Sequence, residues 1–234
     1  MKFKIVSLFV LCAILISCGT SRQGGKKQRK GTKAQVVLTP EQQRKYDYFF
    51  LEASRLKMKD DYSAAFDLLQ HCLTINPDAS SALYEISQYY MYLKQVPQGQ
   101  AALEKAVEND PDNYWYSQGL ASLYQQQNEM QKATNLLESM ATRFSDRMDP
   151  LYSLLDIYNR LEEYDNVITT LNRLEEKMGK NEQLSMEKFR IYLQKKDNQS
   201  AFREIESLVE EYPMDMRYQV ILGDVYMQND KKDE

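Results

Sequence analysis

Side chains that could carry out chemistry are sparse in this sequence and do not form a catalytic set. His71 is the only histidine, so multi-histidine metal sites are excluded and any nucleophile-histidine-carboxylate triad would depend on this residue. Gly24-Gly25 is not followed by the Gly-Lys-Ser/Thr segment of a phosphate-binding loop. Adjacent carboxylates such as Glu162-Glu163 are common on exposed helix faces and need a pocket to become acid/base groups. The sequence therefore predicts no enzyme activity, no metal site and no cofactor.

The N-terminus has the pattern of an export signal. Lys2 and Lys4 precede an apolar run from Ile5 to Ser17. The run is too short to span a bilayer comfortably and has the length of a signal-peptide core. An ordinary secretory peptide and a single anchor helix are the alternatives at this point.

The four residues Leu15-Ile16-Ser17-Cys18 resemble the lipobox of bacterial lipoproteins. The resemblance implies cleavage before Cys18, a diacylglycerol on its thiol, and acylation of the new amino group. Three acyl chains anchor a protein stably where one does not. Gly19 stands where an aspartate would resemble an inner-membrane retention signal. We therefore expect a signal peptide over residues 1–17 and a chain held by lipid in the bacterial cell envelope, at the outer membrane facing the periplasm.

A basic segment separates Cys18 from the rest of the chain. Residues 19–33 contain six lysines and arginines and no acidic residue, a composition that cannot form a core. Residues 34–234 contain 22 basic and 34 acidic residues. We expect residues 18–38 to form a flexible tether that joins an acidic domain to a membrane. The tether is either a solvated spacer or a segment attracted to anionic headgroups, at about 1 kcal/mol for each basic residue near the surface.

The remainder of the chain repeats with a period of 34 residues. Small residues recur at Ala65, Gly99, Ala133 and Ala201, with Val167 as the exception, and prolines close three of the units. Such a period is the signature of stacked helical pairs. We place the unit starts near residues 46, 80, 114, 148, 182 and 216. The tyrosines that mark the register are Tyr90, Tyr124, Tyr158, Tyr192 and Tyr226.

The apolar spacing within each unit predicts two amphipathic helices. In the first unit, a leading helix runs to about Met58, and apolar residues at three-and-four spacing predict a second helix over 62–75. Thr39, Pro40 and Glu41 are typical of a helix start, as an N-cap, a proline at the first helical position and a first-turn acid. The sixth unit supplies only its first helix, over 216–227. The sequence thus predicts an all-α fold of five helix pairs and one unpaired helix.

This pattern resembles the tetratricopeptide repeat family, which has a small residue in the first helix of each unit and an aromatic residue three positions later. Leu155 and Phe189 depart from the pattern at the small position. The resemblance covers about residues 46–234 and implies a right-handed superhelical solenoid of antiparallel helix pairs over residues 39–234. The residues that fit the small position are Ala53, Ser87, Ala121 and Gly223.

The resemblance also implies a concave face lined by the first helices. Rings on this face would give rigid contact area, and amides could bond the backbone of an extended peptide. The alternative for each ring is packing between neighbouring first helices. The lysine, asparagine and arginine of the co-chaperone carboxylate clamp are absent from the matching positions. The candidate partner-binding residues are Phe50, Tyr84, Gln88, Tyr92, Trp115, Gln118, Tyr152, Asn159, Arg160 and Arg190.

These observations predict a membrane-anchored periplasmic scaffold that binds protein or peptide partners through its concave face, without nucleic acid or metal. Because the sixth unit has no second helix, we also expect sequence beyond residue 234. The alternative is a targeting or regulatory front part of a larger protein, whose enzymatic or glycan-binding domain lies beyond that residue.

Overall fold

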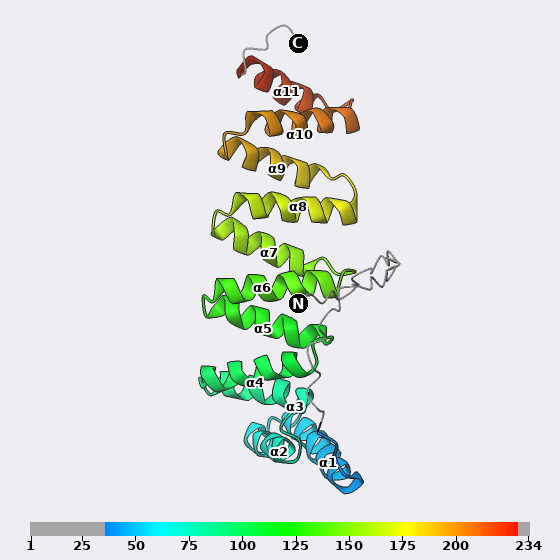
Figure 1. Ribbon diagram of the computed structural model, residues 1–234, viewed down its shortest axis with the longest axis vertical. Helices are drawn as coiled ribbons and strands as arrows, with labels where there is room; N and C mark the ends of the chain where they lie inside the picture. Colours follow the sequence, from blue (N-terminus) through cyan, green and yellow to red (C-terminus); the bar gives the residue numbers. More distant parts are fainter. Residues whose placement is uncertain (1–35, 229–234) are drawn as a thin grey trace, which may run out of the picture. The chain divides into compact units, whose positions relative to one another are not determined.

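The structure is a computed structural model that describes residues 36–228. The signal peptide, the lipidated Cys18 and most of the tether, as predicted from the sequence, lie outside these residues. Residues 36–228 belong to one compact unit with eleven α-helices and no strand (Figure 1). The helices are α1 (Pro40–Lys57), α2 (Tyr62–Ile75), α3 (Ser80–Tyr92), α4 (Val96–Asn109), α5 (Tyr114–Gln126), α6 (Met130–Arg143), α7 (Asp149–Arg160), α8 (Tyr164–Met178), α9 (Glu182–Gln194), α10 (Asn198–Glu211) and α11 (Met216–Gln228).

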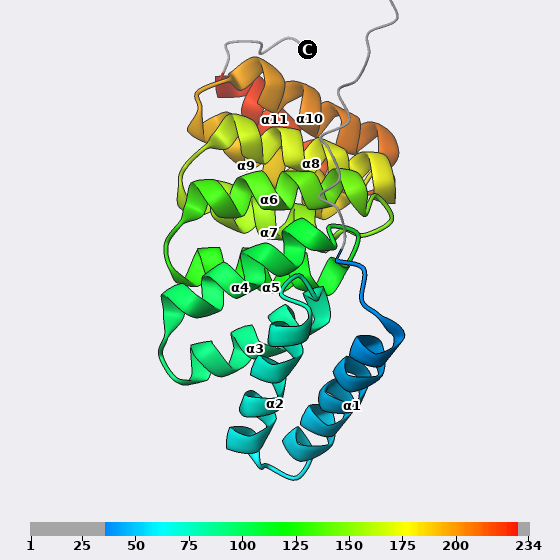
Figure 2. The same ribbon diagram turned by 60° about the horizontal axis from the view of Figure 1, so that its bottom comes forward.

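The helices stack in chain order as five pairs and one unpaired helix. Each first helix packs against the second helix of its unit, and each second helix packs against the first helix of the next unit. Figure 2 shows α6, α8 and α10 following one another on the side nearer to the viewer. The all-α repeat solenoid predicted from the 34-residue period is confirmed within residues 36–228, and its right-handed sense stays a prediction.

The first helix begins where the sequence predicted. The Thr39 hydroxyl accepts a hydrogen bond from the amide of Gln42 at 3.2 Å, and the Gln42 side chain accepts one from the amide of Thr39 at 2.9 Å. This reciprocal pair satisfies two amides that have no partner within the helix. Pro40 occupies the first helical position, where its missing N–H costs nothing.

Small residues allow the paired helices to approach closely. Ala65, Ala121 and Ala133 are fully buried, at 0% exposure. A Cβ atom at Gly99 would lie 2.8 Å from Sδ of Met91 and 3.2 Å from the backbone oxygen of Ser87. A side chain at Gly99 would therefore displace Met91 or the backbone of α3.

The repeated tyrosines bind the preceding second helix in two ways. Tyr124 donates a hydrogen bond to Oε1 of Glu104 at 2.9 Å, and Tyr158 donates one to Oε1 of Glu138, in register, at 3.3 Å. The rings of Tyr90 and Tyr226 instead make edge contacts with Phe66 and Phe202, with centroids 5.4 and 4.8 Å apart. The register tyrosine therefore links consecutive units in both cases.

The turns inside the five complete units share one backbone conformation. Each contains a non-glycine residue with φ between 56° and 62°, and these residues also recur every 34 positions. The next amide donates to a carbonyl five residues earlier, as from Glu129 to Tyr124 at 2.8 Å. This arrangement closes the C-terminus of each first helix and fixes its angle to the second helix. The five residues with positive φ are Asp60, Lys94, Asn128, Glu162 and Lys196.

A charged cluster interrupts the apolar core between the fourth and fifth units. Lys188 on α9 is only 4% exposed, at the register position that Leu154 and Leu120 occupy in earlier units. Its ammonium group lies 2.8 Å from Glu175 on α8 and 3.0 Å from Glu204 on α10. We call Lys180, Lys188, Glu175 and Glu204 the buried ion cluster, since Lys180 also contacts both carboxylates, at 3.3 and 3.0 Å.

Within the buried ion cluster, the pKa values of Lys188 and Glu175 both shift toward the charged form. Burial acts to lower the pKa of Lys188, but the hydrogen bonds and charges of Glu175 and Glu204 outweigh it and raise that pKa. Burial likewise acts to raise the pKa of Glu175, and the two lysines outweigh it and lower that pKa. The ions therefore hold α8, α9 and α10 together where other units use aliphatic contacts.

Candidate functional site

One face of α3 is the centre of the candidate interaction surface. Its residues recur at three-and-four spacing, so they point in one direction from the helix. They line two hollows, one near each end of the helix. The α3 stripe consists of Ser81, Tyr84, Glu85, Gln88, Tyr89 and Tyr92.

The first hollow, here the Trp115 hollow, has a volume of about 350 Å³ and spans α1, α3 and α5. Two of its rings pack on each other: those of Tyr84 and Tyr116, with centroids 4.8 Å apart. Trp115 contacts Tyr114 edge-on at 5.3 Å but remains 62% exposed. The indole is therefore oriented by its neighbours while most of its surface faces solvent. The lining residues are Phe50, Ser81, Tyr84, Glu85, Asn113, Trp115 and Tyr116.

The position of Trp115 follows from the start of α5. The side chain of Asn113 accepts a hydrogen bond from the amide of Trp115 at 3.1 Å and caps the helix. The guanidinium of Arg147 lies 4.0 Å from the ring centroid of Tyr114 and 5.6 Å from that of Trp115. This cation packs on both rings and limits how far the indole can turn.

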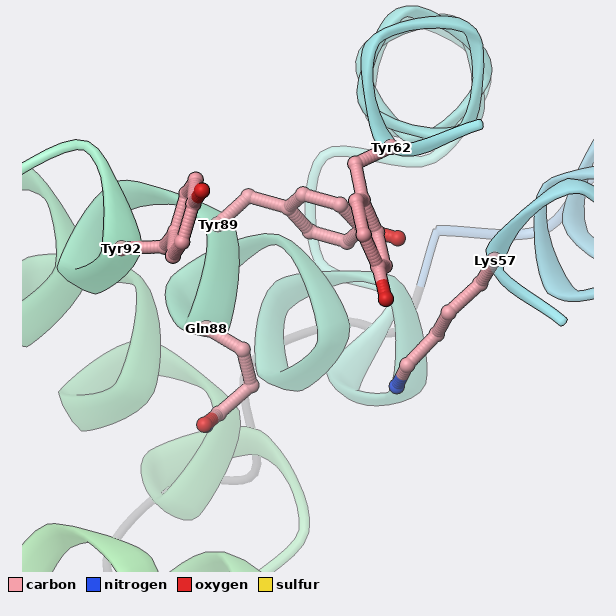
Figure 3. Close-up of a pocket in the computed structure, with 5 residues that line it drawn as sticks. All are labelled: Lys57, Tyr62, Gln88, Tyr89 and Tyr92. Carbon is pink, nitrogen blue, oxygen red and sulfur yellow. The ribbon is translucent and has the colours of Figure 1, made fainter. Parts of the chain in front are cut away.

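The second hollow, here the Tyr92 hollow, has a volume of about 300 Å³ (Figure 3). Figure 3 shows the ring of Tyr89 between those of Tyr62 and Tyr92, with the ends of Lys57 and Gln88 pointing to the same side. The rings of Tyr62 and Tyr89 are 6.4 Å apart and tilted. Tyrosine rings thus form the walls, and groups that can donate hydrogen bonds lie at the rim.

Two hydroxyl groups in this hollow, those of Tyr62 and Tyr89, have a raised pKa. The Tyr62 hydroxyl donates to Oδ1 of Asp60 at 2.7 Å, and this hydrogen bond raises the pKa of Tyr62. Burial raises the pKa of Tyr89. Neither phenol therefore becomes an anion under physiological conditions.

A salt bridge connects the two hollows. Lys57, in the Tyr92 hollow, lies 2.7 Å from Oε2 of Glu85, in the Trp115 hollow. The hydrogen bond to Glu85 raises the pKa of Lys57, so the ammonium stays charged. An ammonium group has three donors, and the two that Glu85 does not use can bind an incoming acceptor.

The structure gathers half of the candidate residues from the sequence into these hollows. Phe50, Tyr84 and Trp115 share the first hollow, and Gln88 and Tyr92 share the second. Tyr84 and Trp115 thus lie in one hollow and Tyr92 in the other.

The other candidates lie outside the two hollows. Gln118 accepts a hydrogen bond from the hydroxyl of Tyr114 at 3.1 Å. The Tyr152 hydroxyl lies 3.4 Å from Sδ of Met178. Three more are exposed: Asn159, Arg160, which lies 3.8 Å from Asp156, and Arg190, which is paired with Glu187.

Seven residues that line the hollows are not among the ten candidates from the sequence: Lys57, Tyr62, Ser81, Glu85, Tyr89, Asn113 and Tyr116. Tyr62 lies on α2, a second helix, whereas all ten candidates lie on first helices, and Asn113 and Tyr116 lie close to the candidate Trp115 in the sequence. The dense tyrosines of residues 84–92 were the available signal. Among residues 36–228, no three metal-ligating side chains are grouped as a metal site, and no helix has the length and hydrophobicity needed to cross a membrane.

Comparisons with known proteins agree with this architecture. Residues 80–113, which form α3 and α4, match the profile of a family described as tetratricopeptide repeat. No curated protein matched the sequence. Residues 80–113 are therefore similar to a tetratricopeptide unit, and they lie in a fold of five helix pairs and one unpaired helix.

Several solved structures share the fold. A tetratricopeptide repeat protein from Parabacteroides merdae ATCC 43184 is 17% identical, with a TM-score of 0.54 over 80% of this chain and 75% of that chain. YrrB, described as a TPR protein with an unusual peptide-binding site, is 13% identical, with a TM-score of 0.51 over 74% and 89%. The Naa15/Naa10 structure bound to HypK-THB is 15% identical, with a TM-score of 0.59 over 82% and 30%. At these identities the similarity establishes the solenoid fold.

Proposed function

We propose that this protein is a scaffold that binds a protein or peptide partner along the α3 stripe, and that it is not an enzyme. The observation that carries the proposal is the pair of hollows on the first helices, connected by the Lys57–Glu85 salt bridge. Exposed, preoriented rings such as Trp115 are typical of binding hot spots. The peptide-binding site described for YrrB, a structural neighbour, supports the same use of the fold.

We further propose that the scaffold is attached to the bacterial cell envelope through lipid on Cys18, in the periplasm and at the outer membrane. The lipobox-like sequence before Cys18 and the apolar run before it support this. The basic tether would let the acidic repeat domain reach partners away from the membrane surface. Lipid anchoring would then concentrate the binding surface at the envelope.

Site-specific crosslinking tests the binding surface. A photoreactive phenylalanine derivative in place of Trp115 should yield a discrete adduct, whereas the same derivative in place of Tyr48 should not. Tyr48 is a matched control because it is 64% exposed, close to the 62% of Trp115, and lines neither hollow.

The partner identified in this way should then be tested in purified form. Trp115→Ala should weaken its binding by about 2 kcal/mol, as expected for a hot spot. The melting temperature should change little because most of the indole faces solvent. Lost stability with intact partner binding would instead place the binding surface elsewhere.

A further inference from the structure

The spacing of the two hollows determines which peptide conformation can fill both. In the Trp115 hollow, α3 contributes residues 81, 84 and 85, and in the Tyr92 hollow it contributes residues 88, 89 and 92. The two sets are centred about six residues apart, which corresponds to roughly 10 Å along a helix that rises 1.5 Å per residue. A single bound segment must therefore present two anchors at roughly this separation on one face.

A polyproline II helix meets this requirement with anchors three residues apart. It has three residues per turn and a rise of about 3.1 Å, so residues i and i+3 lie on one face about 9 Å apart. A β-strand presents same-face residues at roughly 7 or 13 Å, which is too short or too long. An α-helix reaches about 10 Å between i and i+7, but its backbone carbonyls are already bonded within the helix.

The groups around the Tyr92 hollow also favour a polyproline II segment. Its carbonyls are free to accept hydrogen bonds, and the ammonium of Lys57 and the amide of Gln88 lie at the rim as donors. Proline has no N–H group, so the prolines that flank an apolar anchor packed on Tyr62, Tyr89 and Tyr92 bury no backbone donor without a partner. Aromatic-lined grooves with hydrogen-bond donors are the usual receptors for this conformation.

The charge of the described region adds a further condition. Residues 36–228 contain 31 acidic and 20 basic residues. A basic partner segment is attracted by this negative field, a neutral one is not opposed by it, and an acidic one is repelled.

We infer that the α3 stripe recognises a neutral or basic, proline-rich segment in the polyproline II conformation, with apolar anchors at i and i+3. One anchor occupies the Trp115 hollow, and the other occupies the Tyr92 hollow. The carbonyls between the anchors accept hydrogen bonds from Lys57 and Gln88. This inference rests on the proposed binding function of the same surface and specifies its ligand.

Synthetic peptides test the inference by fluorescence anisotropy with the purified full chain. The reference probe is a labelled proline decapeptide with leucines at positions 4 and 7. The comparison peptides carry the leucines at positions 4 and 6, or at positions 4 and 8. A fourth keeps positions 4 and 7 but has glycine and serine instead of proline, and a fifth is an alanine-rich helical peptide with leucines seven residues apart. The reference peptide should bind at least tenfold more tightly than each of the others.

Substitutions in each hollow locate the binding. Tyr92→Ala and Trp115→Ala should each weaken the reference peptide at least fivefold, and both residues are exposed, at 81% and 62%, so neither change should disturb folding. Tyr48→Ala is the matched control and should leave the affinity unchanged. The inference is overturned if a comparison peptide binds as tightly as the reference peptide. It is also overturned if Tyr92→Ala or Trp115→Ala leaves the affinity for the reference peptide unchanged. If no peptide binds while a partner crosslinks at Trp115, the polyproline assignment is wrong and the proposed function stands; if both fail, both are wrong.

Discussion

Replacing Lys188 by methionine should destabilise the C-terminal part of the solenoid. The substitution keeps most of the length of the side chain and removes the charge of a residue that is 4% exposed. The side chains of Glu175 and Glu204 are 21% and 12% exposed and would keep only Lys180 as a charged partner. Removing one partner of a buried ion pair costs about 3–5 kcal/mol. Because Lys180 remains, we expect the lower end, about 3 kcal/mol.

The assay is urea unfolding followed by circular dichroism at 222 nm, combined with hydrogen exchange. Exchange should accelerate first in α8, α9 and α10, since stability in a repeat protein depends on nearest-neighbour interfaces. Lys105→Met is the matched control, because Lys105 and Asp78 form a 2.8 Å pair with side chains 38% and 40% exposed. An exposed pair contributes about 0–1 kcal/mol. If Lys188→Met costs no more than this control, the reasoning is refuted.

An apolar replacement of the buried ion cluster should restore stability. Glu175 stands in register with Val107, and Glu204 with Leu136, so Lys188→Met combined with Glu175→Val and Glu204→Leu extends the aliphatic core. Such replacements are commonly neutral or stabilising by about 1–4 kcal/mol. We expect the free energy of unfolding of the triple variant to lie at most about 1 kcal/mol below that of the parent.

The free energy of unfolding should depend on pH differently in the parent and in the triple variant. The pKa of Glu175 is lowered by folding, so its contribution to stability is complete above the unfolded value, about 4.3. That contribution is lost as the pH falls through the lower folded value. The parent should therefore lose more stability than the triple variant between about pH 4.5 and 2. Parallel pH profiles would show that the cluster does not stabilise the fold.

Four further predictions concern other parts of the chain. Tyr124→Ala should cost about 3–5 kcal/mol, because the ring is 8% exposed and its loss leaves a cavity; Ala133→Arg should be at least as harmful, since it forces a charge into a fully buried position. Melting curves like those of the parent would show that the repeat register is wrong. Cys18→Ser should abolish labelling by a fatty-acid analogue, and unchanged labelling would exclude lipid attachment at this residue. Cys72 should resist thiol reagents in the native protein and react after unfolding, because burial raises its pKa to about 11; rapid native labelling would contradict this.

The sequence determined the secondary structure because each signal was local and repeated. The apolar spacing of 62–75 and the Thr39-Pro40-Glu41 start predicted α1 and α2 closely, and the 34-residue period extended the pattern to α11. A repeat needs only its neighbours for burial, so one register fixes the whole order of helices. The shared positive-φ turn was not visible, because the usual glycine signal is absent and the residues there are aspartate, lysine, asparagine and glutamate.

The candidate site depended on tertiary structure. The first-helix pattern placed Trp115 and Tyr92 on the inner face, but not in separate hollows, because the depth of a hollow depends on side chains from three helices. Tyr62 is 27 residues from Tyr89 in the sequence and contacts its ring only because α2 packs against α3. The same holds for Lys188, whose two glutamate partners come from the neighbouring helices α8 and α10. Local periodicity therefore determined which helices form, and packing between units decided which side chains meet.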